Sequence, residues 1–200
     1  MKKPLKRIQK KLNRLRGVYQ PTALQLEVTN ACNFRCTMCP FHGPEKASDR
    51  AVGFMKIQQY RSILQQFTEL GGSFVIPQGA GESFLHPEIN SMLTMAREEF
   101  DLQIGLNTNG SILTRDHMQM IVDLPLDEIG FSVEAIDPET FRAITGGDLR
   151  SVTENIHRLL GLTNESGNSR PLTRVLMVEQ ELNKAEVPAY VKYWIDHVDE

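Results

Sequence analysis

The residues that could do chemistry in this 200-residue chain lie in one short stretch, because its three cysteines are Cys32, Cys36 and Cys39. Three thiolates on one loop can surround a single soft metal centre, since sulfur ligands select zinc, copper(I) or iron–sulfur clusters. Three thiolates cannot by themselves complete a set of four ligands. A structural zinc site is closed by four protein ligands, whereas a working site keeps one position open. The three cysteines therefore indicate a metal centre with an open position.

Three other interpretations of these cysteines compete with an open metal centre. A disulfide with one spare thiol requires an oxidising compartment, and the basic first residues lack the apolar core of a secretory leader. Cysteines without any ligand would be scattered through the core rather than crowded on one loop. A zinc site completed by His42 or His86 is chemically sound and stays open as an alternative.

Composition and hydropathy are ordinary for a soluble globular protein, with 40% hydrophobic and 24% charged residues. No apolar run approaches the roughly 20 residues needed to cross a bilayer. Because no secretory leader is evident and a metal site needs reduced thiols, we expect a cytoplasmic protein without a membrane span.

The N-terminal segment differs in charge from the rest of the chain. Residues 1–16 hold eight of the 22 Lys and Arg and no acidic residue, so the remainder has a net charge of −11. Apolar residues recur there at steps of three and four, namely Leu5, Ile8, Leu12 and Leu15. We predict a basic amphipathic helix within residues 1–21 that packs its apolar stripe on the domain formed by residues 22–200. Nucleic acid is then an unlikely partner. The alternative is a zinc-binding interaction protein whose basic helix binds nucleic acid.

From residue 22 onward, short apolar runs alternate with helical patterns. We expect strands at 23–28, 73–76, 102–106, 128–133 and 172–178. A helix is expected after each strand. Apolar stripes mark the first and last of these helices, namely Ile57, Tyr60, Leu64 and Phe67, and Val187, Tyr190, Val191 and Trp194. The second begins at Pro87, the third is capped by Thr114, and the fourth has Asp137 as cap and Pro138 as first residue. An extra helix is expected at about residues 149–162, before the fifth strand.

Strands and helices that alternate at this spacing indicate right-handed crossovers and a parallel sheet. We therefore predict an α/β fold, a partial (β/α) barrel of five strand–helix units over residues 22–200. In such barrels the chemistry lies in the loops that follow the strands. Glycine-rich or polar residues do follow three of the predicted strands, at 78–87, at 107–110, and at Ser132 and Glu134, which would face the same side.

The spacing Cys-x3-Cys-x2-Cys, followed at once by Pro40, resembles the cluster loop of the radical S-adenosylmethionine (SAM) superfamily. In that family three cysteines hold a 4Fe–4S cluster, and the free iron chelates the amino and carboxylate groups of SAM. An electron from the cluster cleaves the sulfonium and gives a 5′-deoxyadenosyl radical that abstracts hydrogen from substrate. The resemblance implies a 4Fe–4S cluster held by Cys32, Cys36 and Cys39, SAM as second cofactor, and a reductase or a flavodoxin- or ferredoxin-like electron donor.

The resemblance also covers the strand ends. The turn after the second strand is similar to the family's Gly-Gly-Glu-Pro segment, whose backbone holds the SAM amino group. The polar residues after the third and fourth strands look like its Thr-Asn-Gly and Ser-x-Asp segments, and the methionine before the third cysteine would cover the adenine. The residues expected to bind SAM are Met38, Ala80, Gly81, Glu82, Asn107, Asn109, Ser132 and Glu134.

The segment 134–141, with Thr145-Gly146-Gly147 after it, resembles members that carry further cluster-binding cysteines in a C-terminal domain. These 200 residues contain no such cysteines. We predict that a longer parent chain supplies a sixth strand, since the fifth would otherwise be an exposed edge. The subgroup resemblance favours a peptide substrate and an oxidoreductase or maturase type of reaction, with carbohydrates or nucleosides as the next candidates.

Overall fold

The computed structural model describes residues 20–45, 50–124, 126–167 and 171–200. The predicted basic helix lies almost entirely outside this range, so the division of the chain at residues 21 and 22 stays a prediction. The strands are β1 (Ala23–Gln25), β2 (Phe74–Ile76), β3 (Gln103–Thr108), β4 (Glu128–Ser132) and β5 (Leu172–Leu176). They form one parallel sheet in the order β1-β2-β3-β4-β5. The predicted α/β fold with a partial, unclosed barrel is confirmed.

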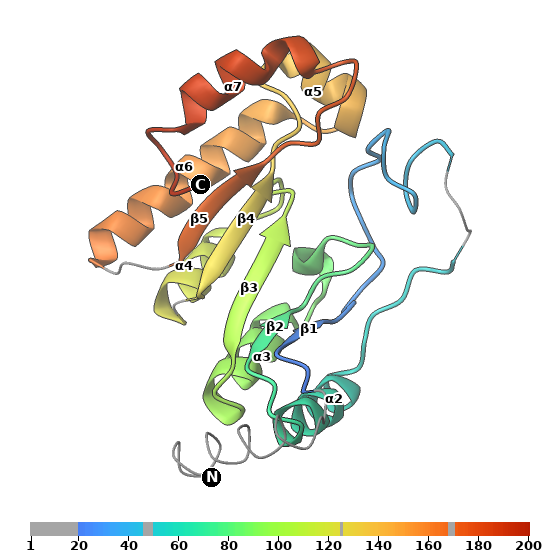
Figure 1. Ribbon diagram of the computed structural model, residues 1–200, viewed down its shortest axis with the longest axis vertical. Coiled ribbons are helices and arrows are strands. Elements are labelled where there is room, and N and C mark those ends of the chain that lie inside the picture. The colour runs from blue at the N-terminus through green and yellow to red at the C-terminus, as the bar shows by residue number, and fades with distance from the viewer. Residues whose placement is uncertain (1–19, 46–49, 125, 168–170) are drawn as a thin grey trace.

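The connecting helices alternate with the strands as expected. They are α2 (Ile57–Glu69), α3 (Ile89–Thr94), α4 (Arg115–Asp123), α5 (Pro138–Thr145), α6 (Leu149–Ser166) and α7 (Val187–Trp194), with a π-helical turn at Met95–Glu99 and 3-10 turns at Ser83–Leu85 and Lys184–Glu186. The long loop after β1, drawn in blue in Figure 1, rises along one side of the sheet toward the end at which the β3 and β4 arrows point. This loop contains the cysteines.

Local capping signals place two helices where the sequence predicts them. The Thr114 side chain accepts a hydrogen bond from the His117 amide, and the His117 ring accepts one from the Thr114 amide. Asp137 accepts hydrogen bonds from the Glu139 and Thr140 amides at the start of α5. These bonds satisfy amides that the first helical turn leaves without partners.

The start of α3 differs from the prediction, since it begins at Ile89 and not at Pro87. A buried histidine organises the approach to this helix. His86 Nδ1 accepts a hydrogen bond from the Glu88 amide at 3.0 Å, and its Nε2 lies 2.9 Å from the Met55 carbonyl oxygen. Because both ring nitrogens have protein partners, His86 is a structural residue and cannot complete a zinc site.

One further expectation is corrected at the first edge of the sheet, and the second edge has a backbone partner within this chain. β1 ends at Gln25 rather than at Val28, because Thr29 forms an antiparallel bridge with Phe54 and leaves the parallel register. At the other edge, backbone groups of β5 form hydrogen bonds with Glu200. The Glu200 amide donates to the Thr173 carbonyl at 3.3 Å, and the Val175 amide donates to the Glu200 carbonyl at 3.0 Å.

The core lies between the sheet and its helices. Strand residues Val75, Ile104, Leu106, Ile129 and Phe131 pack with helix residues Leu64, Met92, Ile121, Val152 and Trp194. The predicted stripe on α7 is partly wrong, because Tyr190 and Trp194 are buried but Val191 is 51% exposed.

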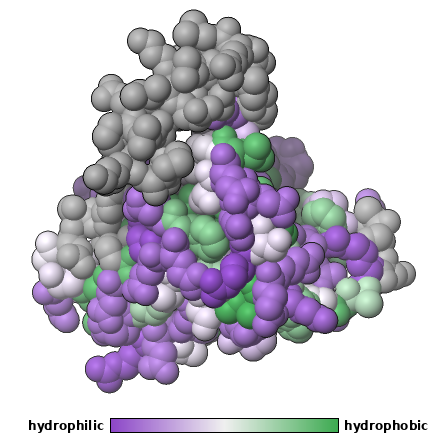
Figure 2. Space-filling model, turned by 90° about the horizontal axis from the view of Figure 1, so that it is seen from below, coloured by the Kyte–Doolittle hydropathy of each residue, from purple (hydrophilic) through white to green (hydrophobic). Residues whose placement is uncertain are grey.

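The described part of the chain contains no helix long and apolar enough to span a membrane. Figure 2 shows hydrophilic residues over most of the described surface on the face that it presents, with apolar residues in small patches between them.

Candidate active site

One cavity at the carboxyl ends of the strands brings the sequence-predicted residues together. Its volume is about 290 Å³. Its wall includes Cys32, Cys36, Cys39, Met38, Ala80, Gly81, Glu82, Asn107, Asn109, Ser132 and Glu134, which are all of the predicted metal-binding and SAM-binding residues. The other lining residues were not among the predicted metal-binding and SAM-binding residues, and they are Phe34, Pro40, Gln78, Gly79, Thr108 and Thr145.

The cysteine loop has no regular secondary structure, so contacts with neighbouring elements hold its shape. Two backbone hydrogen bonds tie it to the end of α5. The Arg35 amide donates to the Thr145 carbonyl at 3.0 Å, and the Thr37 amide donates to the Ile144 carbonyl at 2.7 Å. The C-terminus of α5 therefore fixes the middle of the loop, between the first and third cysteines.

The loop also closes on a glycine. The Gly43 amide donates to the Cys39 carbonyl at 3.0 Å. A Cβ atom at Gly43 would lie 2.5 Å from that oxygen and 2.8 Å from the carbonyl oxygen of Cys36. Such contacts are too short for any side chain, so this tight return after the third cysteine requires glycine.

The glycine-rich turn after β2 approaches the cysteine loop through its backbone. The Glu82 amide donates to the Ala31 carbonyl at 2.7 Å. A Cβ atom at Gly81 would lie 2.4 Å from the Ala31 oxygen and 2.6 Å from the Thr29 oxygen. Glycine at position 81 thus permits direct contact between the turn and the residue that precedes the first cysteine.

The Glu82 side chain joins the turn to the end of β3. It is 4% exposed, and it accepts hydrogen bonds from the Phe84 amide at 3.2 Å, the Thr108 hydroxyl at 2.9 Å and the Asn109 amide at 2.8 Å. Burial raises the pKa of this carboxyl, and the three hydrogen bonds oppose that rise. The resemblance had pointed only to the backbone here, so this side-chain role was missed.

The substitution Glu82→Gln is expected to lower the free energy of unfolding by about 1–3 kcal/mol, because an amide group would face at least one of the three donors. Denaturant unfolding of the metal-free protein measures this loss. Glu98→Gln is the control, since Glu98 is exposed on the π-helical turn, and surface changes of this kind usually stay within about 0.5 kcal/mol. Equal stability of the two variants would contradict the role of Glu82.

Asparagines at the end of β3 face the cavity. Asn109 donates to the Asn33 side-chain oxygen at 2.9 Å, which links β3 to the cysteine loop. Asn107 belongs to the strand itself rather than to the loop after it. A Cβ atom at Gly130 would lie 2.3 Å from Asn107 Oδ1, so glycine on β4 makes room for that side chain.

The loop after β5 also contacts the cysteine loop, which the sequence did not predict. The Thr37 hydroxyl donates to Gln180 Oε1 at 3.2 Å, and Gln180 Nε2 lies 3.8 Å from the Met38 sulfur. Asn183 is fully buried and holds this loop by donating to the Glu134 carbonyl at 2.7 Å. Only the position of these residues after a strand could have drawn attention to them.

Acidic groups are crowded in the cavity. Burial raises the pKa of the Cys36 thiol to about 12, and the charges of Cys32 and Glu134 add to this rise. Burial also raises the pKa of Cys32 and that of the Glu134 carboxyl, which accepts a hydrogen bond from the Val178 amide at 2.9 Å. Such a site favours a cationic centre, which would stabilise the thiolates.

This pKa predicts slow alkylation of Cys36 in the reduced, metal-free protein. At pH 8 a thiol with a pKa of about 12 has roughly a thousandth of the thiolate of a thiol with an ordinary pKa of 9.0. Iodoacetamide should therefore modify Cys36 at least about a hundred-fold more slowly than the same residue in the unfolded chain. Mass spectrometry of peptides from native and denatured samples measures both rates, and equal rates would refute the prediction.

The donor set fits an iron–sulfur cluster better than a single ion. All three cysteines are free. Within the described ranges, no three Cys, His, Asp or Glu side chains lie close enough together to hold one metal ion. A cluster has several irons, so its thiolates need not converge on one point. Among the described residues the side chains therefore form no closed site for a single zinc ion.

A parallel α/β sheet with a three-cysteine loop after its first strand and polar strand ends around one cavity defines a class of metal-dependent enzyme. The sequence profile of the Radical SAM superfamily matches residues 26–178. This chain belongs to the radical SAM superfamily. Its members use a 4Fe–4S cluster and SAM, which confirms the predicted class and cofactors.

Similarity to individual proteins covers the catalytic region. The chain is 29% identical over 176 residues to GTP 3′,8-cyclase of Vibrio vulnificus (strain YJ016), across 87% of this chain and 50% of the cyclase. It therefore spans about half the length of that relative. SuiB of Streptococcus suis bound to S-adenosylmethionine superposes with a TM-score of 0.74 at 18% identity, over 96% of this chain and 43% of SuiB. SuiB bound to precursor peptide SuiA superposes with a TM-score of 0.72 at 18% identity, over 96% of this chain and 42% of SuiB. Both SuiB structures share the fold of this chain.

Proposed function

We propose that this chain is the catalytic part of an enzyme that cleaves SAM reductively and abstracts hydrogen from a substrate. The observation that carries the proposal is the single cavity whose wall includes the three cysteines and every predicted SAM-binding residue. Those residues come from the loops after β1 and β2 and from the ends of β3 and β4, so only the fold brings them together.

The residues divide into two groups by what they would hold. Cys32, Cys36 and Cys39 would bind the cluster, which when bound supplies the electron for reductive cleavage of SAM. The backbone of the turn at residues 80–82 would hold the SAM amino group, because the Glu82 side chain is occupied by its three hydrogen bonds.

The remaining cavity residues would orient and enclose SAM. Met38 would cover the adenine, since its side chain is apolar and adaptable, and its sulfur lies 3.8 Å from Gln180 Nε2. Asn107, Ser132 and Glu134 offer polar groups on one side of the cavity. Enclosure by these residues would exclude water from the reacting atoms and aim the 5′ carbon at one C–H bond.

Anaerobic reconstitution with iron and sulfide tests the proposal. The protein should turn brown, bind about four irons per chain, and release 5′-deoxyadenosine when reduced in the presence of SAM. A colourless protein that retains one zinc per chain would refute it and favour the zinc-binding alternative. Because the chain spans about half of its relatives, the test is best made on the chain and on any longer parent protein in parallel.

For the substrate, we propose a peptide, so that the reaction would be of the oxidoreductase or maturase type. The shared fold with SuiB, whose structure was solved with a precursor peptide, supports this choice. GTP is the second candidate, because of the 29% identity to a GTP 3′,8-cyclase. Either substrate should accelerate 5′-deoxyadenosine formation, so a comparison of GTP with short peptides encoded beside the gene separates the two.

We also propose a cytoplasmic setting and a flavodoxin- or ferredoxin-like electron donor. The three free cysteines support the first proposal, because a reducing compartment keeps thiols available for iron. The second follows from the need for one electron in each reductive cleavage. The iron content of the protein after anaerobic purification from cytoplasmic extract tests the proposed cytoplasmic setting.

A further inference from the structure

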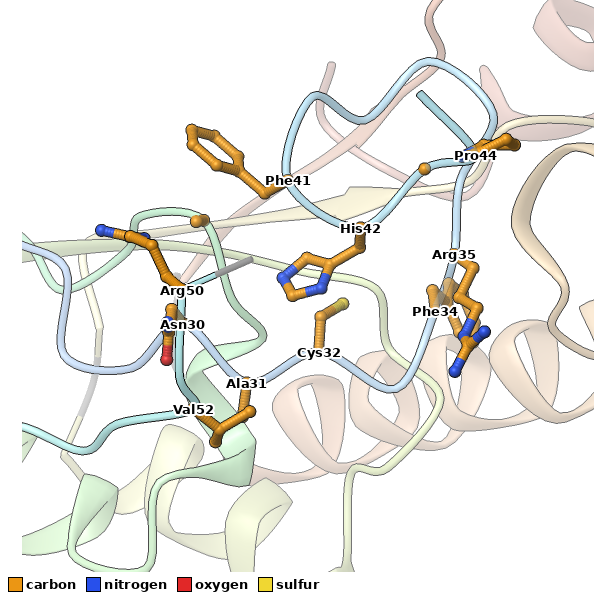
Figure 3. Close-up of a pocket in the computed structure, with 12 residues that line it drawn as sticks. Asn30, Ala31, Cys32, Phe34, Arg35, Phe41, His42, Pro44, Arg50 and Val52 are labelled. Atoms are coloured by element: carbon orange, nitrogen blue, oxygen red, sulfur yellow. The ribbon is translucent and has the colours of Figure 1, made fainter. Parts of the chain in front are cut away.

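A second cavity shares part of the cysteine loop with the candidate active site. Its volume is about 540 Å³, and it shares Cys32, Phe34 and Ala80 with the first cavity. Figure 3 shows the Cys32 side chain facing this space, with the His42 ring beside it. Ala80 is the only predicted SAM-binding residue in its wall. A predicted cluster ligand is therefore accessible by a route that bypasses the SAM cavity.

Two exposed apolar side chains line this second cavity, and a third exposed one follows closely in the sequence. Phe41 is 43% exposed, Val52 66% and Phe54 48%. Phe41 and Val52 line the cavity, and Phe54 follows two residues later. Exposed apolar groups that gather around one opening mark interaction sites more often than those scattered singly over a surface.

The charges at this opening are basic. Arg35 and Arg50 line the cavity, and no acidic residue of the described chain does. The Arg50 guanidinium lies 5.8 Å from the centroid of the Phe41 ring and also pairs with Glu27 at 2.8 Å. Residues 17–200 carry a net charge of −11, so the opening differs in sign from the chain as a whole.

We propose that Arg35, Phe41, Arg50, Val52 and Phe54, which we call the donor surface, dock a small acidic one-electron carrier protein. The proposal rests on the proposed function, because it assumes a cluster at the three cysteines. One electron leaves the carrier, which is oxidised by one electron, and enters the cluster, which is reduced by one. No bond forms or breaks, and the cluster needs no proton.

Size and charge both favour this occupant. A folded carrier cannot enter a SAM cavity of about 290 Å³, so it must approach the cluster from outside. Transient redox complexes use small interfaces, commonly below about 1,200 Å² in total, and basic groups speed the approach of an acidic partner. Nucleic acid fits less well, because a surface with two arginines and three apolar side chains neutralises few phosphates.

The test compares a protein reductant with a chemical one, using the reconstituted protein and Arg35→Glu/Val52→Glu. Stopped-flow absorbance follows reduction of the cluster by flavodoxin hydroquinone and, separately, by dithionite. We expect the double variant to be reduced at least ten-fold more slowly by flavodoxin and equally fast by dithionite. Its affinity for oxidised flavodoxin, measured by calorimetry, should fall as well. In the wild type, salt should slow the flavodoxin reaction.

Control variants keep the result specific. Lys192→Glu at an exposed position of α7 makes the same two-unit charge change as Arg35→Glu and should leave both rates unchanged. Val52→Glu alone provides a second variant in case the double variant loses its cluster, because Val52 is 66% exposed. An unchanged flavodoxin rate would overturn the proposal, and so would equal slowing by both reductants. Failure of dithionite to reduce the wild type would instead refute the proposed function.

Discussion

Alanine at Cys32, Cys36 or Cys39 is expected to abolish the brown cluster and to lower 5′-deoxyadenosine formation by more than about a hundred-fold. Changes outside the ligand set of a metal site already cost ten- to a hundred-fold, and loss of a direct ligand should cost more. The chain has no spare thiol, because its cysteines are these three. His86 cannot substitute, since both of its ring nitrogens are hydrogen-bonded.

The measurement combines iron content, the visible spectrum and chromatography of the SAM cleavage products for each single variant. Met38→Leu is the matched control within the same loop. It keeps an apolar side chain of similar size and should retain the cluster while it weakens SAM binding. A cysteine variant that stays brown and still forms 5′-deoxyadenosine would show that the loop is not the cluster site.

Wherever strand order decides the position, the sequence predicted which residues line the common cavity. Parallel strands end at one edge of a sheet, so Asn107 on β3 and Ser132 on β4 had to lie near each other once both strands were recognised. The cysteine loop after β1 and the glycine-rich turn after β2 follow the same rule. Their common cavity is a consequence of topology, which apolar periodicity reveals.

Contacts that depend on the path of irregular loops were not predictable. Thr145 reaches the cavity because α5 ends against the cysteine loop, and Gln180 reaches Met38 because buried Asn183 bends the loop after β5. No periodic pattern encodes either bend. The early end of β1 has the same origin, since pairing of Thr29 with Phe54 links residues 25 positions apart.

Gly81→Ala is expected to weaken SAM binding by roughly ten- to a hundred-fold, because a displacement of about 1 Å at a binding site has effects of this size. The new Cβ atom would lie 2.4 Å from the Ala31 oxygen. That oxygen belongs to the backbone and accepts the Glu82 amide at 2.7 Å, so the turn itself must move. Because Gly81 is not among the residues with positive φ, the effect is steric and not conformational.

Gly161→Ala is the matched control, since the same chemical change occurs where nothing lies within 4 Å of the new atom. Gly161 lies inside α6, and alanine there should raise the free energy of unfolding by about 0.5–1 kcal/mol without any effect on SAM. Calorimetry with S-adenosylhomocysteine on reconstituted proteins measures the affinities. Wild-type affinity in Gly81→Ala would mean that the turn holds no part of SAM. A loss in both variants would mean that binding reports overall stability. Only a loss confined to Gly81→Ala identifies the backbone contact between the turn and the cysteine loop as the feature that positions SAM.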